Sequence, residues 1–168
     1  TPNENPLLLG WKKDGNSLFV VDQEGAFSQI YELDLEGKSA VKFSHGEHSL
    51  SQVEISGSGE YIGYAASDFN TPQEGYITPI DSFNPQKVTS LSASRSQENF
   101  VVEKIQWKSK DKKFDLEGIF IHPKPSQAGT LFPLLTLLID SGPSSVTGYV
   151  GDLRGYPLSC LSLLKKGY

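Results

Sequence analysis

The sequence predicts a mixed fold, in which antiparallel β-sheet units in the first half are followed by the start of an α/β domain. Three observations predict it. A strand-turn-strand pattern occurs twice between residues 11 and 81, a serine-rich segment lies between residues 90 and 100, and a long apolar stretch from residue 132 runs into a glycine-bearing turn. A chain of 168 residues has room for one ordinary domain or for parts of two.

The first half contains an imperfect repeat with an offset of 44 residues, from Trp11 to Ile55. Each unit begins with an apolar anchor and a polar, glycine-containing turn, and then enters a β-rich run. A second alternating strand follows, at Gln29–Leu35 in the first unit and at Glu74–Asp81 in the second. Short strands that recur about every 40–45 residues are typical of β-propeller blades. An ordinary antiparallel sandwich is the alternative, because two copies are few for a repeat.

A propeller blade buries its faces only against neighbouring blades. We therefore expect residues 1–90 to be the last blades of a β-propeller, and residues 1–168 expressed alone to be unstable or to aggregate. The stretch Thr1–Pro6 resembles the middle of a longer chain, so it carries no information on cellular compartment. The polar residues 91–100 read as a linker.

The second half is predicted to open with a hairpin, formed by Val101–Lys108 and Phe114–His122, whose flanks alternate β-branched or aromatic residues with polar ones. A Pro/Gly loop follows. The apolar run Phe132–Ile139 then has the length and composition of a buried strand. Leucines at a helical spacing and a Lys-Lys-Gly stop predict a helix over Tyr156–Lys166.

These motifs, in this order, resemble the prolyl oligopeptidase family of serine peptidases, most closely its acylaminoacyl-peptidase-like branch. Trp11–Leu18 is similar to the blade motif of that family, and Glu103–Pro123 to the opening hairpin of its catalytic domain. Phe132–Leu135 and the later Gly167-Tyr168 match the strand and the helix end that follow. The resemblance implies that residues 101–168 are the truncated N-terminal portion of an α/β-hydrolase catalytic domain.

The resemblance also places an oxyanion-hole candidate at Gly142. The family usually has His-Gly-Gly-Pro where this chain has Asp140, Ser141, Gly142 and Pro143. The backbone N–H of Gly142 would help to bind the tetrahedral oxyanion, and a purely conformational glycine that permits the turn is the alternative. A carboxylate at Asp140 that pointed toward the developing negative charge would oppose catalysis.

Ser141 does not fit the role of nucleophile. That chemistry requires Gly-x-Ser-x-Gly on a strand-to-helix elbow, and the residue two positions before Ser141 is Ile139. No Gly-x-Ser-x-Gly occurs anywhere in the chain. The resemblance therefore implies that the whole Ser, Asp and His triad follows Tyr168, and that residues 1–168 contain no catalytic residue.

For the intact parent, the resemblance implies hydrolysis of short peptides through an acyl-enzyme, with the propeller restricting access to the site. It implies no metal and no organic cofactor. The expected partners are a peptide substrate and the remainder of the hydrolase domain and propeller. An esterase-like hydrolase of the same fold and a non-catalytic β-rich binding module are the alternatives.

Composition narrows the remaining possibilities. A formal net charge of −5 argues against a nucleic-acid partner, and no segment reaches the roughly 18 apolar residues that span a bilayer. The single cysteine, Cys160, excludes an internal disulfide and is expected to be a buried structural thiol. His45 and His48 flank a glutamate in a polar loop, and without a third ligand we interpret them as loop residues. His122 lies at a strand end, away from any expected triad.

Overall fold

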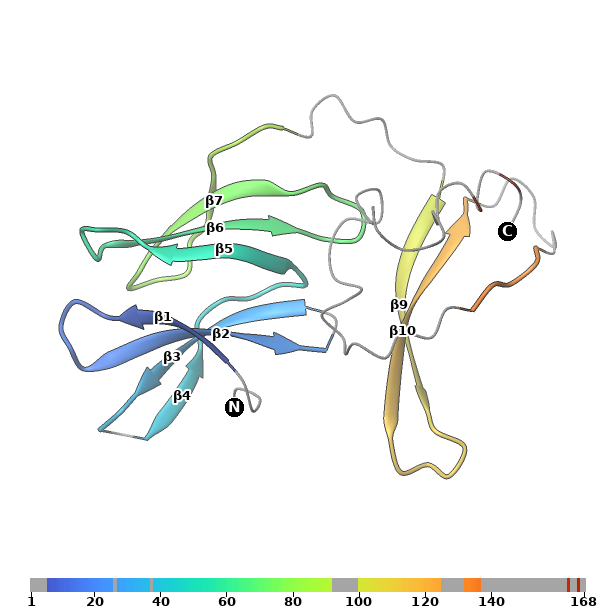
Figure 1. The fold of residues 1–168 in the computed structure, drawn as a ribbon, viewed down its shortest axis with the longest axis horizontal. Helices are drawn as coiled ribbons and strands as arrows, with labels where there is room; N and C mark the ends of the chain where they lie inside the picture. Colours follow the sequence, from blue (N-terminus) through green and yellow to red (C-terminus); the bar gives the residue numbers. More distant parts are fainter. Residues whose placement is uncertain are drawn as a thin grey trace.

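The computed structural model describes residues 6–25, 27–36, 38–91, 100–124, 132–136, 163 and 166. Ten β-strands within these residues form two four-stranded sheets and one two-stranded hairpin, all antiparallel. Figure 1 shows the two sheets stacked on one another, with the hairpin beside them. The described part is thus all-β.

Both sheets are meanders in which each strand pairs with the next one along the chain. The first sheet consists of β1 (Leu7–Trp11), β2 (Ser17–Glu24), β3 (Phe27–Asp34) and β4 (Ser39–Lys42). The second consists of β5 (Ser49–Ile55), β6 (Tyr61–Ser67), β7 (Glu74–Pro79) and β8 (Gln86–Lys87). Two consecutive four-stranded meanders have the form of β-propeller blades, as the repeat predicted.

The strand registers confirm the repeat residue by residue. Trp11 pairs with Leu18 in the first sheet, and Ile55 pairs with Ile62 at the equivalent place in the second. The register of the first strand of each sheet also shifts near its middle, between Leu8 and Gly10 in β1 and between Ser51 and Glu54 in β5. We refer to the two sheets below as blade 1 and blade 2.

The turns after β1 and β5 share one hydrogen-bond pattern. The amide of the residue that follows the strand, Lys12 or Ser56, donates over 2.9 Å to the carbonyl of the first residue of the next strand. Each turn contains a glycine with positive φ, Gly15 at +76° and Gly59 at +71°. Glycine adopts this left-handed conformation without the steric cost that a Cβ brings, which explains why both repeats keep it.

The two blades share one hydrophobic core. Blade 1 contributes Phe19 and Ile30, both without exposed surface, and blade 2 packs Ile62, Tyr64 and neighbouring apolar residues against them. Burying one large apolar side chain contributes about 1.5–3 kcal/mol, so this shared core makes a large contribution to the contact between the blades. On β1 of blade 1, Leu8 and Trp11 remain 60% and 55% exposed. The expected instability of the isolated chain stays a prediction.

The predicted hairpin is confirmed as β9 (Phe100–Lys108) paired with β10 (Asp115–Pro123). One face of the hairpin base packs on the ends of both blades, in a second cluster of buried residues and their partly buried neighbours: Phe27, Phe69, Phe100, Val102, Ile119 and Ile121. The chain reaches the hairpin from blade 2, yet the hairpin contacts the start of β3 in blade 1 as well.

The strand predicted over Phe132–Ile139 is wrong for its described part. Residues 132–136 are exposed and do not lie in a strand, and none of the described strands pairs with them. An apolar run becomes a buried strand only where neighbouring strands accept its backbone hydrogen bonds. Of the helix predicted over 156–166, only residues 163 and 166 are described, so the α/β-hydrolase part of the prediction is not shown.

Candidate functional site

The oxyanion-hole candidate Gly142 and its neighbours Asp140, Ser141 and Pro143 lie outside the described residues, and so does Cys160. The described part of the chain instead contains a cleft of about 400 Å³ where the hairpin meets both blades. The residues that line it are Phe27, Glu47, His48, Asp68, Phe69, Asn70, Thr71, Val102 and Lys104. Sequence reasoning did not find this cleft.

Two phenylalanines form the apolar part of the cleft. Phe27 begins β3, directly beyond the β2–β3 turn, and Phe69 lies in the loop after β6. Their ring centroids are 5.0 Å apart and the rings are tilted by 43°. Both are at most 6% exposed, and Val102 of β9 packs against the same cluster. The hairpin is therefore seated on the aromatic ends of the two blades.

The loop between β6 and β7 brings a carboxylate to the cleft. Asp68 Oδ1 accepts hydrogen bonds from the backbone amides of Asn70, over 2.8 Å, and Thr71, over 2.7 Å. The Asp68 amide donates in turn to the Thr71 carbonyl over 3.2 Å. An aspartate that binds the amides two and three residues later stabilises a turn, so this side chain shapes the loop and cleft wall.

The loop between β4 and β5 supplies Glu47 and His48, and buried side chains of blade 1 hold this loop. Ser44 Oγ donates to Gln29 Oε1 over 2.8 Å and accepts the Ile30 amide at the same distance. Gln29 Nε2 donates to the Gly46 carbonyl over 2.7 Å. The histidine loop expected from the sequence is confirmed, but nothing in the linear pattern indicated its anchor in β3.

Lys104 of β9 joins the two sides of the cleft. Its Nζ lies 2.9 Å from Glu47 Oε1, on the β4–β5 loop, and 5.1 Å from the centroid of the Phe27 ring. The Lys104 side chain is 27% exposed and that of Glu47 is 68% exposed. An ammonium over an aromatic ring and beside a carboxylate is favourable on both counts.

The other histidines lie elsewhere. His45 packs edge-on against Phe83, with ring centroids 5.7 Å apart, and His122 stacks on Phe120 at the base of β10. Among the described residues, no three or more His, Cys, Asp or Glu side chains lie close enough together to hold a metal. No helix in the described part is long and apolar enough to cross a membrane.

The cleft thus offers two carboxylates, an ammonium, an imidazole and two aromatic rings, from both blades and the hairpin. Such a set can bind a chain that carries both polar groups and an apolar side chain, because charge and stacking act side by side. These lining residues are suited to binding a ligand. None of them is the nucleophile that the resemblance implies.

Solved structures with a fold similar to that of this chain include peptidases. The AtxE2 isopeptidase is similar over 93% of this chain, with a TM-score of 0.70 and 16% sequence identity. A variant of that enzyme with Astexin3-dC4 bound is similar over 94% of this chain, with a TM-score of 0.68 and 17% identity. A prolyl endopeptidase matches 73% of this chain, with a TM-score of 0.51 and 20% identity. The described residues therefore have a peptidase-related fold.

The likeness covers only part of each neighbour. The chain spans 23–24% of the length of the isopeptidase chains and 18% of the prolyl endopeptidase chain. No protein-family model and no curated protein matches the chain. At these identities the likeness concerns the fold.

Proposed function

We propose that this chain is part of a serine peptidase of the prolyl oligopeptidase family, related to its acylaminoacyl-peptidase-like branch. Residues 1–90 would be the last blades of its propeller, and residues 101–168 the beginning of its α/β-hydrolase domain. The observation that most supports the proposal is the order blade, blade, hairpin, which the AtxE2 isopeptidase resembles over 94% of this chain. The sequence motifs point independently to the same family.

In this proposal the parent protein hydrolyses short peptides through an acyl-enzyme. The nucleophile, the acid and the histidine base are contributed by chain that follows Tyr168. Gly142 contributes a backbone N–H to the oxyanion hole, where one donor is typically worth about 2.7–4 kcal/mol in the transition state. The segment from Asp140 to Pro143 is then the part of residues 1–168 that belongs to the catalytic apparatus.

The propeller blades would limit which peptides reach that site. The cleft between the blade ends and the β9–β10 hairpin lies at the proposed junction of propeller and catalytic domain, with aromatic rings and charged groups in its walls. A peptide that enters there would meet these groups before it met the nucleophile. The remainder of the hydrolase domain is the expected intramolecular partner of the hairpin.

The proposal is tested on the full-length protein that contains this chain. The protein is treated with a fluorophosphonate probe, the labelled serine is located by mass spectrometry, and hydrolysis of acetylated and free short peptides is compared with that of a p-nitrophenyl ester. The expected result is one labelled serine beyond residue 168 and turnover of peptides. Ester turnover without peptide turnover would support the esterase alternative. Absence of both labelling and turnover would support a binding module.

A further inference from the structure

The cleft has two walls that belong to different units of the fold. One wall comes from the blades, through the start of β3 and the loops β4–β5 and β6–β7. The other is β9 of the hairpin, which presents Val102 and Lys104. These two residues alternate along the strand and so share one face. The width of the cleft therefore depends on how closely β9 approaches the blades.

Two kinds of contact hold β9 there. At the base of the hairpin Val102 packs on Phe27 and Phe69, and Val102 is only 6% exposed. Two residues further along β9, the Lys104 ammonium pairs with Glu47 across the cleft and lies over the ring of Phe27. The apolar contact is the more permanent of the two, because it does not depend on ionic strength.

We propose that Lys104 is a strap that holds β9 across the cleft, and that release of its ammonium from Glu47 and Phe27 lets β9 move away and the cleft open. An ion pair this exposed is easily broken and is screened by salt. The inference rests on the proposed function in one respect, namely that the molecule entering the open cleft is a short peptide. The strap itself is a property of the described fold.

Opening is measured by the reactivity of a cysteine on the closed wall. In the full-length protein, with Cys160→Ser as background, Val102→Cys is labelled with a maleimide under native conditions. Its labelling rate follows the fraction of open molecules, because the side chain is covered when the cleft is closed. The rate is normalised to that of an exposed cysteine placed at Lys110, which corrects for effects of salt on the reaction itself.

Releasing the strap should accelerate this labelling. Lys104→Met keeps the apolar stem but removes the ammonium, and Glu47→Gln removes its partner. Each change is expected to raise the normalised rate about two- to fivefold, the range typical of an exposed ion pair. The matched control is Lys108→Met on the same strand, because Lys108 pairs with Asp115 inside the hairpin.

Two further measurements make the interpretation specific. Lys104→Met combined with Glu47→Gln should accelerate labelling no more than Lys104→Met alone, since both changes break one contact. Raising the salt from about 0.05 M to about 1 M should increase the labelling rate of the protein that retains Lys104 and leave the rate of Lys104→Met unchanged. The reason is that the Debye length falls to about 3 Å at 1 M, so the ion pair is screened. Ala66→Cys, in the core between the blades, should react equally slowly in every variant, which excludes general unfolding.

The proposal is overturned if Lys104→Met and Lys108→Met have the same effect, if the two strap substitutions add in full, or if salt accelerates both proteins alike. Failure of the proposed peptidase function can be distinguished from failure of the strap. The labelling needs no substrate, so a protein without peptidase activity can still show the strap. If the protein is an active peptidase and Lys104→Met does not change the labelling rate of Val102→Cys, the proposed function stands and the strap is refuted.

Discussion

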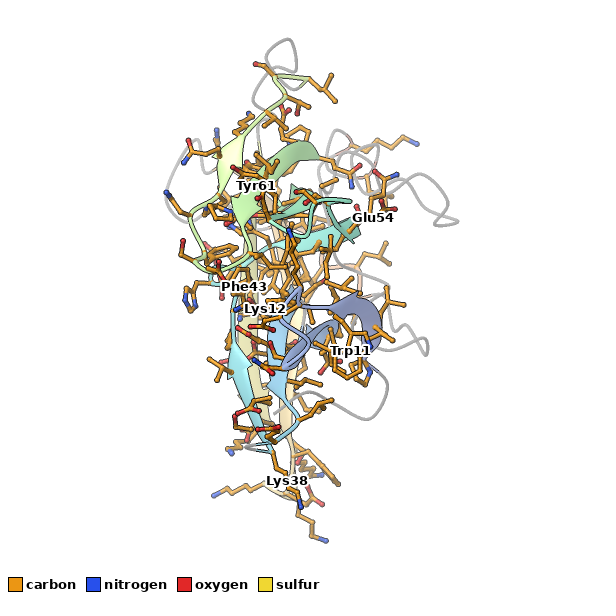
Figure 2. All side chains as sticks on the ribbon, turned by 90° about the vertical axis from the view of Figure 1, so that its left-hand side faces the viewer. Trp11, Lys12, Lys38, Phe43, Glu54 and Tyr61 are labelled. Carbon is orange, nitrogen blue, oxygen red and sulfur yellow. The ribbon has the colours of Figure 1, made fainter. Side chains whose placement is uncertain are left out.

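Lys12 Nζ lies 3.0 Å from Asp81 Oδ1, so an ion pair joins the β1–β2 turn of blade 1 to the residues that follow β7 in blade 2. The same ammonium is 3.2 Å from Glu32 Oε1, in β3 of its own blade. Figure 2 shows Lys12 near the boundary between the two sheets. Burial alone would lower the pKa of Lys12, but the hydrogen bonds to Asp81 and Glu32 outweigh it, and the pKa is raised above its ordinary value.

Replacing Asp81 by Asn should weaken the contact between the blades. The expected loss is about 0.5–1 kcal/mol in the free energy of unfolding, because Asp81 is mostly exposed. Since the pKa of Lys12 is higher in the folded protein, its contribution is complete below pH about 10.5 and fades as the pH rises through the folded pKa. Denaturant unfolding of the full-length protein measures both effects. Glu54→Gln, an exposed change on β5, is the control, and an equal loss there would contradict the assignment.

Tyr64 should ionise only under strongly alkaline conditions. Burial raises its pKa to about 12, with a smaller contribution from the charge of Tyr76, whose ring stacks 5.7 Å away. A tyrosine whose folded pKa is raised stabilises the fold fully below its unfolded pKa of about 10, and this stability is lost progressively up to about pH 12. The loss amounts to about 2–3 kcal/mol.

The difference in absorbance at 295 nm between the full-length protein and its Tyr64→Phe variant isolates this group. The difference should titrate with a midpoint near pH 12. Thermal stability should also fall less steeply between pH 10 and pH 12 in Tyr64→Phe. A midpoint near pH 10 would mean that Tyr64 is solvated and that the blade contact is looser than described.

The turn of the β9–β10 hairpin repeats the blade turns with one strained residue. The Ser109 amide donates to the Phe114 carbonyl over 2.9 Å, and the Lys112 amide to the Ser109 carbonyl over 2.8 Å. Lys112 has a φ of 60°, where the blade turns have glycine. Lys112→Gly should therefore stabilise the protein by about 0.5–1 kcal/mol, since the steric cost of a Cβ in this conformation exceeds the extra entropy that glycine loses on folding.

Gly59→Ala, at the equivalent place in blade 2, is the matched reversal. It should destabilise by about 1 kcal/mol, because the left-handed φ of +71° is costly for a residue with a Cβ. Thermal unfolding of both variants checks the pair. Opposite signs are expected, and a destabilising Lys112→Gly would show that the Lys112 side chain makes a contact worth more than the strain.

Glu74 should anchor the chain where it leaves blade 2. Its side chain is fully buried, accepts hydrogen bonds from Thr89 Oγ1 and from the Leu91 amide, the latter over 3.0 Å, and lies 3.3 Å from Lys87 Nζ. Glu74→Gln is expected to cost about 1.5–3 kcal/mol, the usual range for hydrogen bonds to a charged group.

Limited trypsin digestion gives the local readout for this change. Cleavage after Lys87 should accelerate in Glu74→Gln, because the buried group that binds the segment from Lys87 to Leu91 loses its charge and one of its two acceptor oxygens. Glu60→Gln, in the exposed β5–β6 turn, should leave the rate unchanged. If cleavage is equally fast in both, Glu74 does not hold the exit of the blade.

Asp140 and Ser141, which precede the proposed oxyanion-hole donor Gly142, allow a test by enzyme activity. If the parent is a serine peptidase and the Asp140 carboxylate points toward the developing oxyanion, Asp140→Asn should raise kcat about tenfold, equivalent to about 1.4 kcal/mol, because it removes an opposing negative charge. Ser141→Ala should change kcat less than twofold, since the nucleophile is expected elsewhere. Steady-state kinetics on a short peptide checks both, and loss of activity in Ser141→Ala would identify that residue as the nucleophile.

Some features of the fold follow from short-range patterns. The pairing of Trp11 with Leu18 and of Ile55 with Ile62 matches the repeat, because a strand, a glycine turn and a second strand encode a hairpin within a few residues. The β9–β10 hairpin was predicted for the same reason. The run at 132–136 was predicted wrongly, because a buried strand and any other apolar segment read alike until a pairing partner is known.

The sequence by itself indicated the strand-turn-strand repeat of the two meanders and the polar character of the loop that carries Glu47 and His48. Only the tertiary structure decided that Lys104 meets Glu47, 57 residues away, and that Phe27 and Phe69 of different blades form one floor beneath the hairpin. Alternating strand residues and turn residues determine local structure over a few positions, so they can be recognised in the sequence. Which faces meet is decided by the packing of whole sheets, and this packing creates the cleft.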